Sequence, residues 1–73
     1  MVVEVRPATE VERFVEFARA NGCQCHRGYA GHRVTVDAPL ARDPTEARRI
    51  ALDMIATFCA DNTLADVRVT QYD

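Results

Sequence analysis

The residues best suited to chemistry lie close together in the middle of the chain. Residues 23–33 contain two of the three cysteines and both histidines, together with two arginines. These side chains are Cys23, Cys25, His26, Arg27, His32 and Arg33. Thiolate and imidazole groups bind zinc and similar metals, and an activated thiolate can act as a nucleophile. The stretch therefore raises three possibilities: a metal site, cysteine-based catalysis, or contact with a charged partner.

A metal site in this stretch would use Cys23, Cys25 and His26. An extended segment sends alternate side chains to opposite faces, so His26 would point away from both thiols. The three could reach one ion only if the segment is a loop. The other interpretation places both cysteines in the hydrophobic core, where free cysteines are commonly found. We favour the core interpretation and expect no cofactor, and we keep metal binding as an alternative.

Catalysis by a cysteine needs a base beside the thiol and a group that orients that base. Cys25 and His26 would lie on opposite sides of a strand, and no acidic residue occurs between Asn21 and Val36. A chain of 73 residues is also short for enclosing a typical substrate pocket. We therefore expect that the protein is not an enzyme.

The second half of the stretch has the composition of a contact surface. Arg27, Tyr29, His32 and Arg33 lie in and around a glycine-containing turn. Arg and Tyr are enriched where proteins meet, so these four residues are the expected contacts with a protein partner. The same types can hold a phosphate and stack on a base, which keeps weak nucleic-acid binding as an alternative. The net charge of −2 provides no overall attraction to nucleic acid.

Hydrophobic periodicity predicts the elements that position these residues. Alternating apolar residues indicate strands at 2–6, 33–38 and 65–72, and helical spacing indicates helices near 10–20 and 44–60. Thr9 and Glu12 match a capping box at the first helix. Asp43 before Pro44 matches a capped start of the second. Residues 23–27 also alternate, but more weakly, and we interpret them as a strand joined to the next by a turn.

The order of elements predicts an α+β fold. We expect residues 1–73 to form a single domain, a two-layer β-α-β-β-α-β sandwich of the ferredoxin-like type. Its sheet would be mainly antiparallel, with two helices on one face. If residues 23–30 are a loop, the sheet has three strands and the class is still α+β.

Such a sheet leaves one face without helices. The side chains expected there are Val2, Glu4, Arg6, Gln24, His26, Arg33, Thr35, Arg68, Thr70 and Tyr72. Positive and negative charges are both present, as on a solvated surface or a self-complementary interface. We expect a small interaction or regulatory module that acts through this open face and the 26–33 turn, and that self-associates as a homodimer.

The cellular setting is inferred from the cysteines and from hydropathy. Three cysteines is an odd number, which favours free thiols and a reducing compartment. No apolar run approaches the roughly 20 residues of a membrane span, and the first residues lack the pattern of a signal peptide. We therefore expect a cytoplasmic protein that does not contact a membrane.

Overall fold

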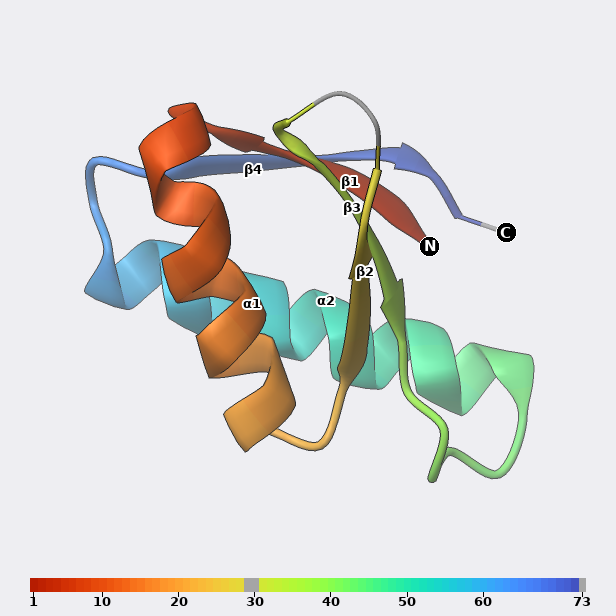
Figure 1. The fold of residues 1–73 in the computed structure, drawn as a ribbon. Coiled ribbons are helices and arrows are strands. Elements are labelled where there is room, and N and C mark those ends of the chain that lie inside the picture. The colour runs from red at the N-terminus through yellow and green to blue at the C-terminus, as the bar shows by residue number, and fades with distance from the viewer. Residues whose placement is uncertain (29–30, 73) are drawn as a thin grey trace.

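Four strands and two α-helices follow one another as β-α-β-β-α-β in residues 1–28 and 31–72, the residues that the computed structural model describes. The elements are β1 (Val2–Arg6), the short 3-10 helix η1 (Ala8–Glu10), α1 (Val11–Ala20), β2 (Gln24–Arg27), β3 (Arg33–Asp37), α2 (Pro44–Asp61) and β4 (Asp66–Gln71) (Figure 1). Among these residues, no helix combines the length and the hydropathy that crossing a bilayer requires.

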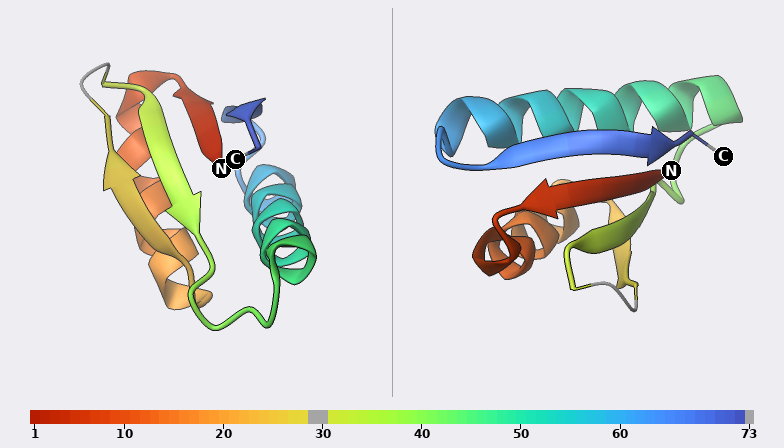
Figure 2. Two further views of the ribbon diagram at one scale, coloured as in Figure 1. Left: turned by 90° about the vertical axis from the view of Figure 1, so that its right-hand side faces the viewer. Right: turned by 90° about the horizontal axis from the view of Figure 1, so that it is seen from above.

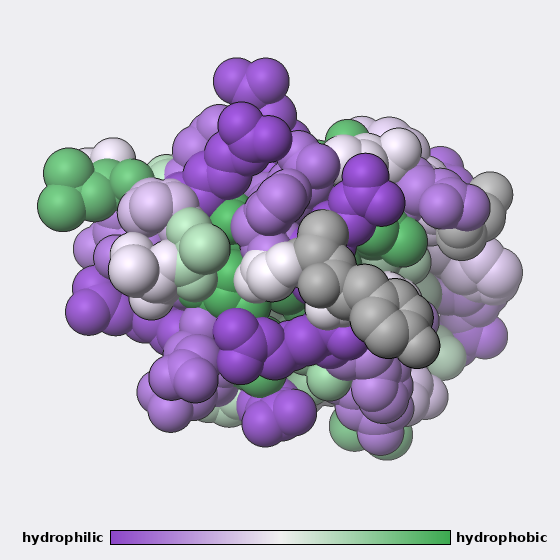
Figure 3. Space-filling view, turned by 45° about the horizontal axis from the view of Figure 1, so that its top comes forward, coloured by the Kyte–Doolittle hydropathy of each residue, from purple (hydrophilic) through white to green (hydrophobic). Residues whose placement is uncertain are grey.

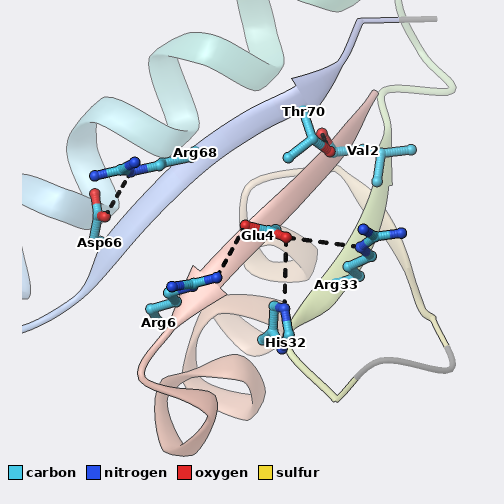
Figure 4. A network of polar contacts seen from close by, with 8 residues as sticks. All are labelled: Val2, Glu4, Arg6, His32, Arg33, Asp66, Arg68 and Thr70. Atoms are coloured by element: carbon cyan, nitrogen blue, oxygen red, sulfur yellow. Dashed lines mark hydrogen bonds and ion pairs between the residues drawn. The ribbon is translucent and has the colours of Figure 1, made fainter.

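The strands form one antiparallel sheet in the order β2-β3-β1-β4. Both helices lie on the same side of this twisted sheet (Figure 2 and Figure 4). The predicted α+β class is therefore confirmed. Residues 24–27 pair with residues 34–37, so the three-stranded alternative with a loop at 23–30 is wrong. Their side chains alternate between exposed and buried until the strand reaches Arg27, which made this strand hard to recognise.

The start of α1 differs from the prediction. Glu10 donates its N–H to the carbonyl of Pro7 at 2.9 Å, which closes a 3-10 turn over residues 8–10. Thr9 lies inside that turn, whereas an N-cap residue needs an extended backbone. The helix begins at Val11 without a side-chain cap, so the predicted capping box of Thr9 and Glu12 is wrong.

The end of α1 and the start of α2 follow the sequence signals. Gly22 has a φ of +82°, and the N–H groups of Gly22 and Cys23 donate to the carbonyls of Arg19 and Ala18 at 3.2 and 2.9 Å. This is a Schellman turn, which uses the ability of glycine to adopt positive φ. At α2, the Asp43 carboxylate accepts the Glu46 N–H at 2.8 Å, which confirms the capped start.

The core lies between the helices and the inner face of the sheet. Its fully buried members include Val3, Val5, Val11, Val34, Phe14 and Phe58. Phe14 of α1 meets Phe58 of α2 edge to face, with ring centroids 5.2 Å apart. Cys23 and Cys25 are only 3% and 5% exposed and belong to the same cluster. The expectation that both thiols are core side chains is therefore confirmed.

Candidate functional site

The open face of the sheet carries a group of charged side chains centred on Glu4. One carboxylate oxygen, Oε1, lies 3.5 Å from His32 Nε2 and 3.8 Å from Arg33 Nε. The other oxygen, Oε2, lies 3.6 Å from Arg6 Nη2. Figure 4 shows the three basic side chains converging on this one carboxylate. We call Glu4, Arg6, His32 and Arg33 the Glu4 cluster.

The sheet register brings the cluster together. Glu4 pairs directly with Arg33 of β3 on one side and with Arg68 of β4 on the other. Arg6 lies two residues further along β1 and therefore shares the face of Glu4. Because β1 is a central strand, its one acid is flanked by basic residues on both neighbouring strands. Directly opposed charges of this kind each contribute about 0.2–1 kcal/mol to the sheet.

The cluster has more positive than negative charge. Two guanidinium groups and one imidazole share a single carboxylate, and each guanidinium has five N–H donors. The side chains of Arg6 and Arg33 are 65% and 57% exposed, while that of Glu4 is only 19% exposed. The acid is therefore largely covered and the arginines face outward. This arrangement can accept a further carboxylate from outside, because Arg binds carboxylates through paired hydrogen bonds.

A second charged pair continues the same face on β4. Arg68 Nε donates to Asp66 Oδ2 at 3.0 Å, and the Thr70 hydroxyl donates to the Val2 carbonyl at 3.2 Å. Figure 3 shows a mainly hydrophilic surface on this side of the molecule, with smaller apolar areas between the polar groups. As far as the described residues show, the face is mainly polar, and its apolar areas are smaller than the patches that mark permanent interfaces.

The four predicted contact residues do not form one surface. His32 and Arg33 meet at Glu4, as described above. Arg27 instead lies on the helix side of the sheet, with its Nη1 atom 3.6 Å from Oε1 of Glu12 in α1. Tyr29 lies outside the described residues.

Tyr72 was expected on the open face, but it contacts a helix. The guanidinium carbon of Arg48 in α2 lies 5.0 Å from the centre of the Tyr72 ring. This is a cation–π distance. Tyr72, which follows β4, therefore faces α2 instead of the open face.

Cys23 and Cys25 are part of the hydrophobic core. Burial raises the pKa of the Cys25 thiol to about 11, helped by the neighbouring Cys23, and burial also raises the pKa of Cys23. Protonated thiols are poor nucleophiles and poor metal ligands. His26 is exposed on the opposite face of β2, so the three residues of the alternative metal site do not converge. In residues 1–28 and 31–72, no three His, Cys, Asp or Glu side chains are arranged to hold a metal ion.

The central role of Glu4 was not predicted from the sequence. Alternation placed Glu4 and Arg6 on the polar face, but it did not show which strands lie beside β1. One sequence signal could have suggested the cluster. The first strand has a single acid, Glu4, and two other strands have a base at an outward position, Arg33 and Arg68. Glu4 and Arg33 are in contact because β1 lies beside β3 in the sheet.

Comparison with known proteins provides no relative for this chain. No family model matches it, and neither does a curated protein or a solved structure.

Proposed function

We propose that this chain is a small, non-catalytic interaction or regulatory module that binds an acidic segment of a partner protein on its open sheet face. The observation that carries the proposal is the Glu4 cluster, in which one covered carboxylate holds two outward-facing arginines in place. An incoming carboxylate would use guanidinium N–H groups that Glu4 does not occupy. His32, 34% exposed at its side chain, adds a third polar group from the 26–33 turn.

The open face supports a protein partner better than a nucleic acid. Binding of single strands uses exposed aromatic rings on which bases stack. Among the described residues, Phe14, Phe17 and Phe58 pack in or against the core, and the half-exposed ring of Tyr72 has Arg48 of α2 over it. Two arginines that already share a carboxylate also provide little attraction for a phosphate backbone. The charges of the face suit a short acidic peptide, which can place a carboxylate between Arg6 and Arg33.

The state of the cysteines supports both the non-catalytic role and the cellular setting. Burial raises the pKa of the Cys23 and Cys25 thiols rather than lowering it, which is the reverse of what a cysteine nucleophile needs. Cys23, Cys25 and Cys59 are all free, as is usual in a reducing compartment. We therefore propose the cytoplasm as the site of action.

We also propose a ferredoxin-like classification for the fold. The order β-α-β-β-α-β along the chain, with β1 and β3 at the centre of the sheet and β2 and β4 at its edges, supports this assignment. Fold type by itself does not indicate a function, so the proposal for function depends only on the open face.

The experiment is a binding titration with two defined probes. Fluorescence anisotropy would compare a glutamate-rich peptide with a single-stranded oligonucleotide of equal charge. We expect the peptide to bind more tightly, and the double substitution Arg6→Ala with Arg33→Ala to weaken its binding about tenfold or more. Arg49→Ala is the control, because Arg49 is likewise an exposed arginine with an acidic ion-pair partner, Asp53 at 3.7 Å on α2. Equal losses in the double variant and the control would contradict the proposal, as would tighter binding of the oligonucleotide.

A further inference from the structure

We propose that the outer edge of β2, together with the adjoining side of α1, binds a second copy of this chain. The two β2 strands would pair antiparallel and join both sheets into one. This surface is separate from the open face, so the inference does not depend on an acidic partner binding there.

Among the residues that the structure describes, the edge of β2 presents backbone groups that β3 does not bind. β2 is the outermost strand next to β3. The Gly28 N–H donates to the Arg33 carbonyl at 2.9 Å, and the register pairs His26 with Thr35 and Gln24 with Asp37. In an antiparallel ladder, every second residue bonds to the neighbouring strand, so the N–H and C=O groups of Cys25 and Arg27 point away from β3. Such an edge is a template for another strand.

One register of two β2 strands satisfies all of these groups. If Cys25 lies opposite Arg27 of the second copy, each of these pairs exchanges two backbone hydrogen bonds. The twofold axis then passes beside His26, which faces His26 of the second copy on the open side. An interface of this kind uses the same residues in both copies and closes as a dimer.

The side of α1 next to β2 has a charge pattern that complements itself. Glu12, Val15, Glu16 and Arg19 line a hollow of about 300 Å³ together with Arg27. Their spacing places them on one side of the helix, with acids at its first turns and a base at its last. A twofold axis makes the two α1 helices run in opposite directions. Glu12 of each copy would then face Arg19 of the other.

The strand register and the helix pairing agree on one axis. Arg27 at the end of β2 contacts Glu12 at the start of α1, and Cys23 before β2 is hydrogen-bonded to Ala18 near the helix end. The two elements therefore run side by side in opposite directions. The middle of β2 lies beside the middle of α1, where Val15 is only 6% exposed.

An exposed apolar side chain extends the same surface. A second, shallow hollow of about 530 Å³ runs along β2 from Cys23 to His26 and is also lined by Pro39 and Leu40. Leu40 is 87% exposed. Its position beside the free edge allows a paired second copy to cover it, which adds apolar burial to the backbone hydrogen bonds.

The other edge of the sheet is less suited to self-pairing. The Val5 N–H donates to the His32 carbonyl at 2.7 Å, so the odd residues of β1 bond to β3 and the even residues bond to β4. Glu4 is paired with Arg68, and the backbone N–H and C=O groups of Val67 and Val69 therefore point away from β1. If Val67 lies opposite Val69 of the second copy, the register equivalent to that of β2, Arg68 would lie opposite Arg68. Two permanently charged guanidinium groups would then repel each other. This favours the β2 edge.

The test measures the dissociation constant of the dimer by sedimentation. We expect wild-type protein to dimerise with a constant in the micromolar range, as is usual for small interfaces. Arg27→Pro removes an outward N–H that β3 does not use, so the monomer is expected to keep its fold and lose dimerisation. Arg27→Ala keeps that N–H and is expected to change the constant by no more than about threefold. Val67→Pro blocks the β4 edge instead and is expected to leave the dimer intact.

A charge exchange between two variants tests the helix contact without changing the backbone. Arg19→Glu and Glu12→Arg alone each place like charges opposite one another and are expected to weaken the dimer about tenfold. An equimolar mixture of the two variants restores opposite charges at both positions, and we expect it to form a heterodimer of nearly wild-type affinity. The mixture also tests the proposed dimer if Arg27→Pro does not fold. A wild-type protein that stays monomeric at millimolar concentration overturns the inference, and so does a dimer that only Val67→Pro disrupts or a mixture that fails to recover.

Discussion

Arg27 Nη1 lies 3.6 Å from Glu12 Oε1, on the helix side of the sheet. Arg33 lies on the other side, with its Nε atom 3.8 Å from Glu4 Oε1. The two basic residues that flank the turn after β2 therefore belong to different surfaces. Arg33 is part of the proposed partner-binding face, and Arg27 is part of the proposed dimer edge. Substitutions at the two positions are therefore expected to have separable effects.

Glu4→Gln is expected to strengthen binding of an acidic peptide. Glu4 competes with an incoming carboxylate for the guanidinium groups of Arg6 and Arg33, and glutamine keeps its size without the charge. We expect the dissociation constant of the glutamate-rich peptide to fall about threefold to tenfold. Asp53→Asn, which removes an acid from the outer surface of α2, serves as the control. Weaker peptide binding by Glu4→Gln would mean that Glu4 matters more for positioning the two arginines than as a competitor of the peptide.

Asp43→Ala is expected to destabilise the fold by about 1 kcal/mol. Asp43 has an extended backbone and accepts the Glu46 N–H at 2.8 Å, so its removal leaves a helix donor without that partner. Thr9→Ala is the matched change at the other helix, where no side-chain cap exists, and is expected to cost no more than about 0.5 kcal/mol. Urea unfolding followed by circular dichroism measures both. Equal losses in the two variants would contradict this assignment of caps.

Phe58→Ala is expected to remove most of the stability of the fold at room temperature. The Phe58 ring is fully buried and contacts both Phe14 and Phe17, which join the two helices. Truncation of a buried Phe costs about 3–5 kcal/mol, a large part of the stability of a domain this small. Leu64→Ala is the control, because Leu64 is 87% exposed. A cooperative unfolding transition close to that of the wild type would show that this contact does not support the core.

The stability of the fold is expected to fall between about pH 9 and about pH 11. The ordinary pKa of a cysteine thiol is 9.0. In the folded chain the pKa of Cys25 is raised to about 11, mainly by burial and to a smaller extent by the neighbouring Cys23. The folded state thus holds its proton more tightly than the unfolded state does. That contribution is complete below the unfolded pKa and is lost as the pH rises toward the folded pKa.

The variant Cys25→Ala removes this effect and provides the reference for it. Urea unfolding at a series of pH values would show the stability of the wild type falling relative to the variant above about pH 9. Cys25 is also expected to react with iodoacetamide only after unfolding, because the reactive species is the thiolate. A constant difference between the two proteins across this range would contradict the buried thiol.

The elements of the fold could be predicted from the sequence because each has a strong local signal. The apolar alternation of residues 2–6 and the helical spacing after Asp43 both depend on side chains close in sequence. The segment 24–27 was less certain, since a four-residue strand with one buried side chain gives little periodicity. At Thr9 the local signal was strong but misleading. The sequence matches a capping box, but the 3-10 turn after Pro7 includes Thr9 and prevents it from capping the helix.

The candidate site could be predicted only in part, because it depends on pairing between distant strands. Alternation assigned Glu4 and Arg33 to the polar face, but their contact follows from β1 lying beside β3. Arg27 was grouped with Arg33 because the two are near in sequence. The alternation of β2 places Arg27 on the same side as Cys25, next to α1. Surfaces formed by strand order therefore required the structure.

NMR mapping tests most directly whether the open sheet face binds an acidic protein segment. Isotope-labelled protein would be titrated with the glutamate-rich peptide while backbone amide shifts are recorded. We predict that the largest changes occur at Arg6, His32 and Arg33, and that residues of α2 such as Arg49 and Asp53 change little. Changes confined to the helices, or no changes at peptide concentrations that saturate weak interfaces, would contradict the claim.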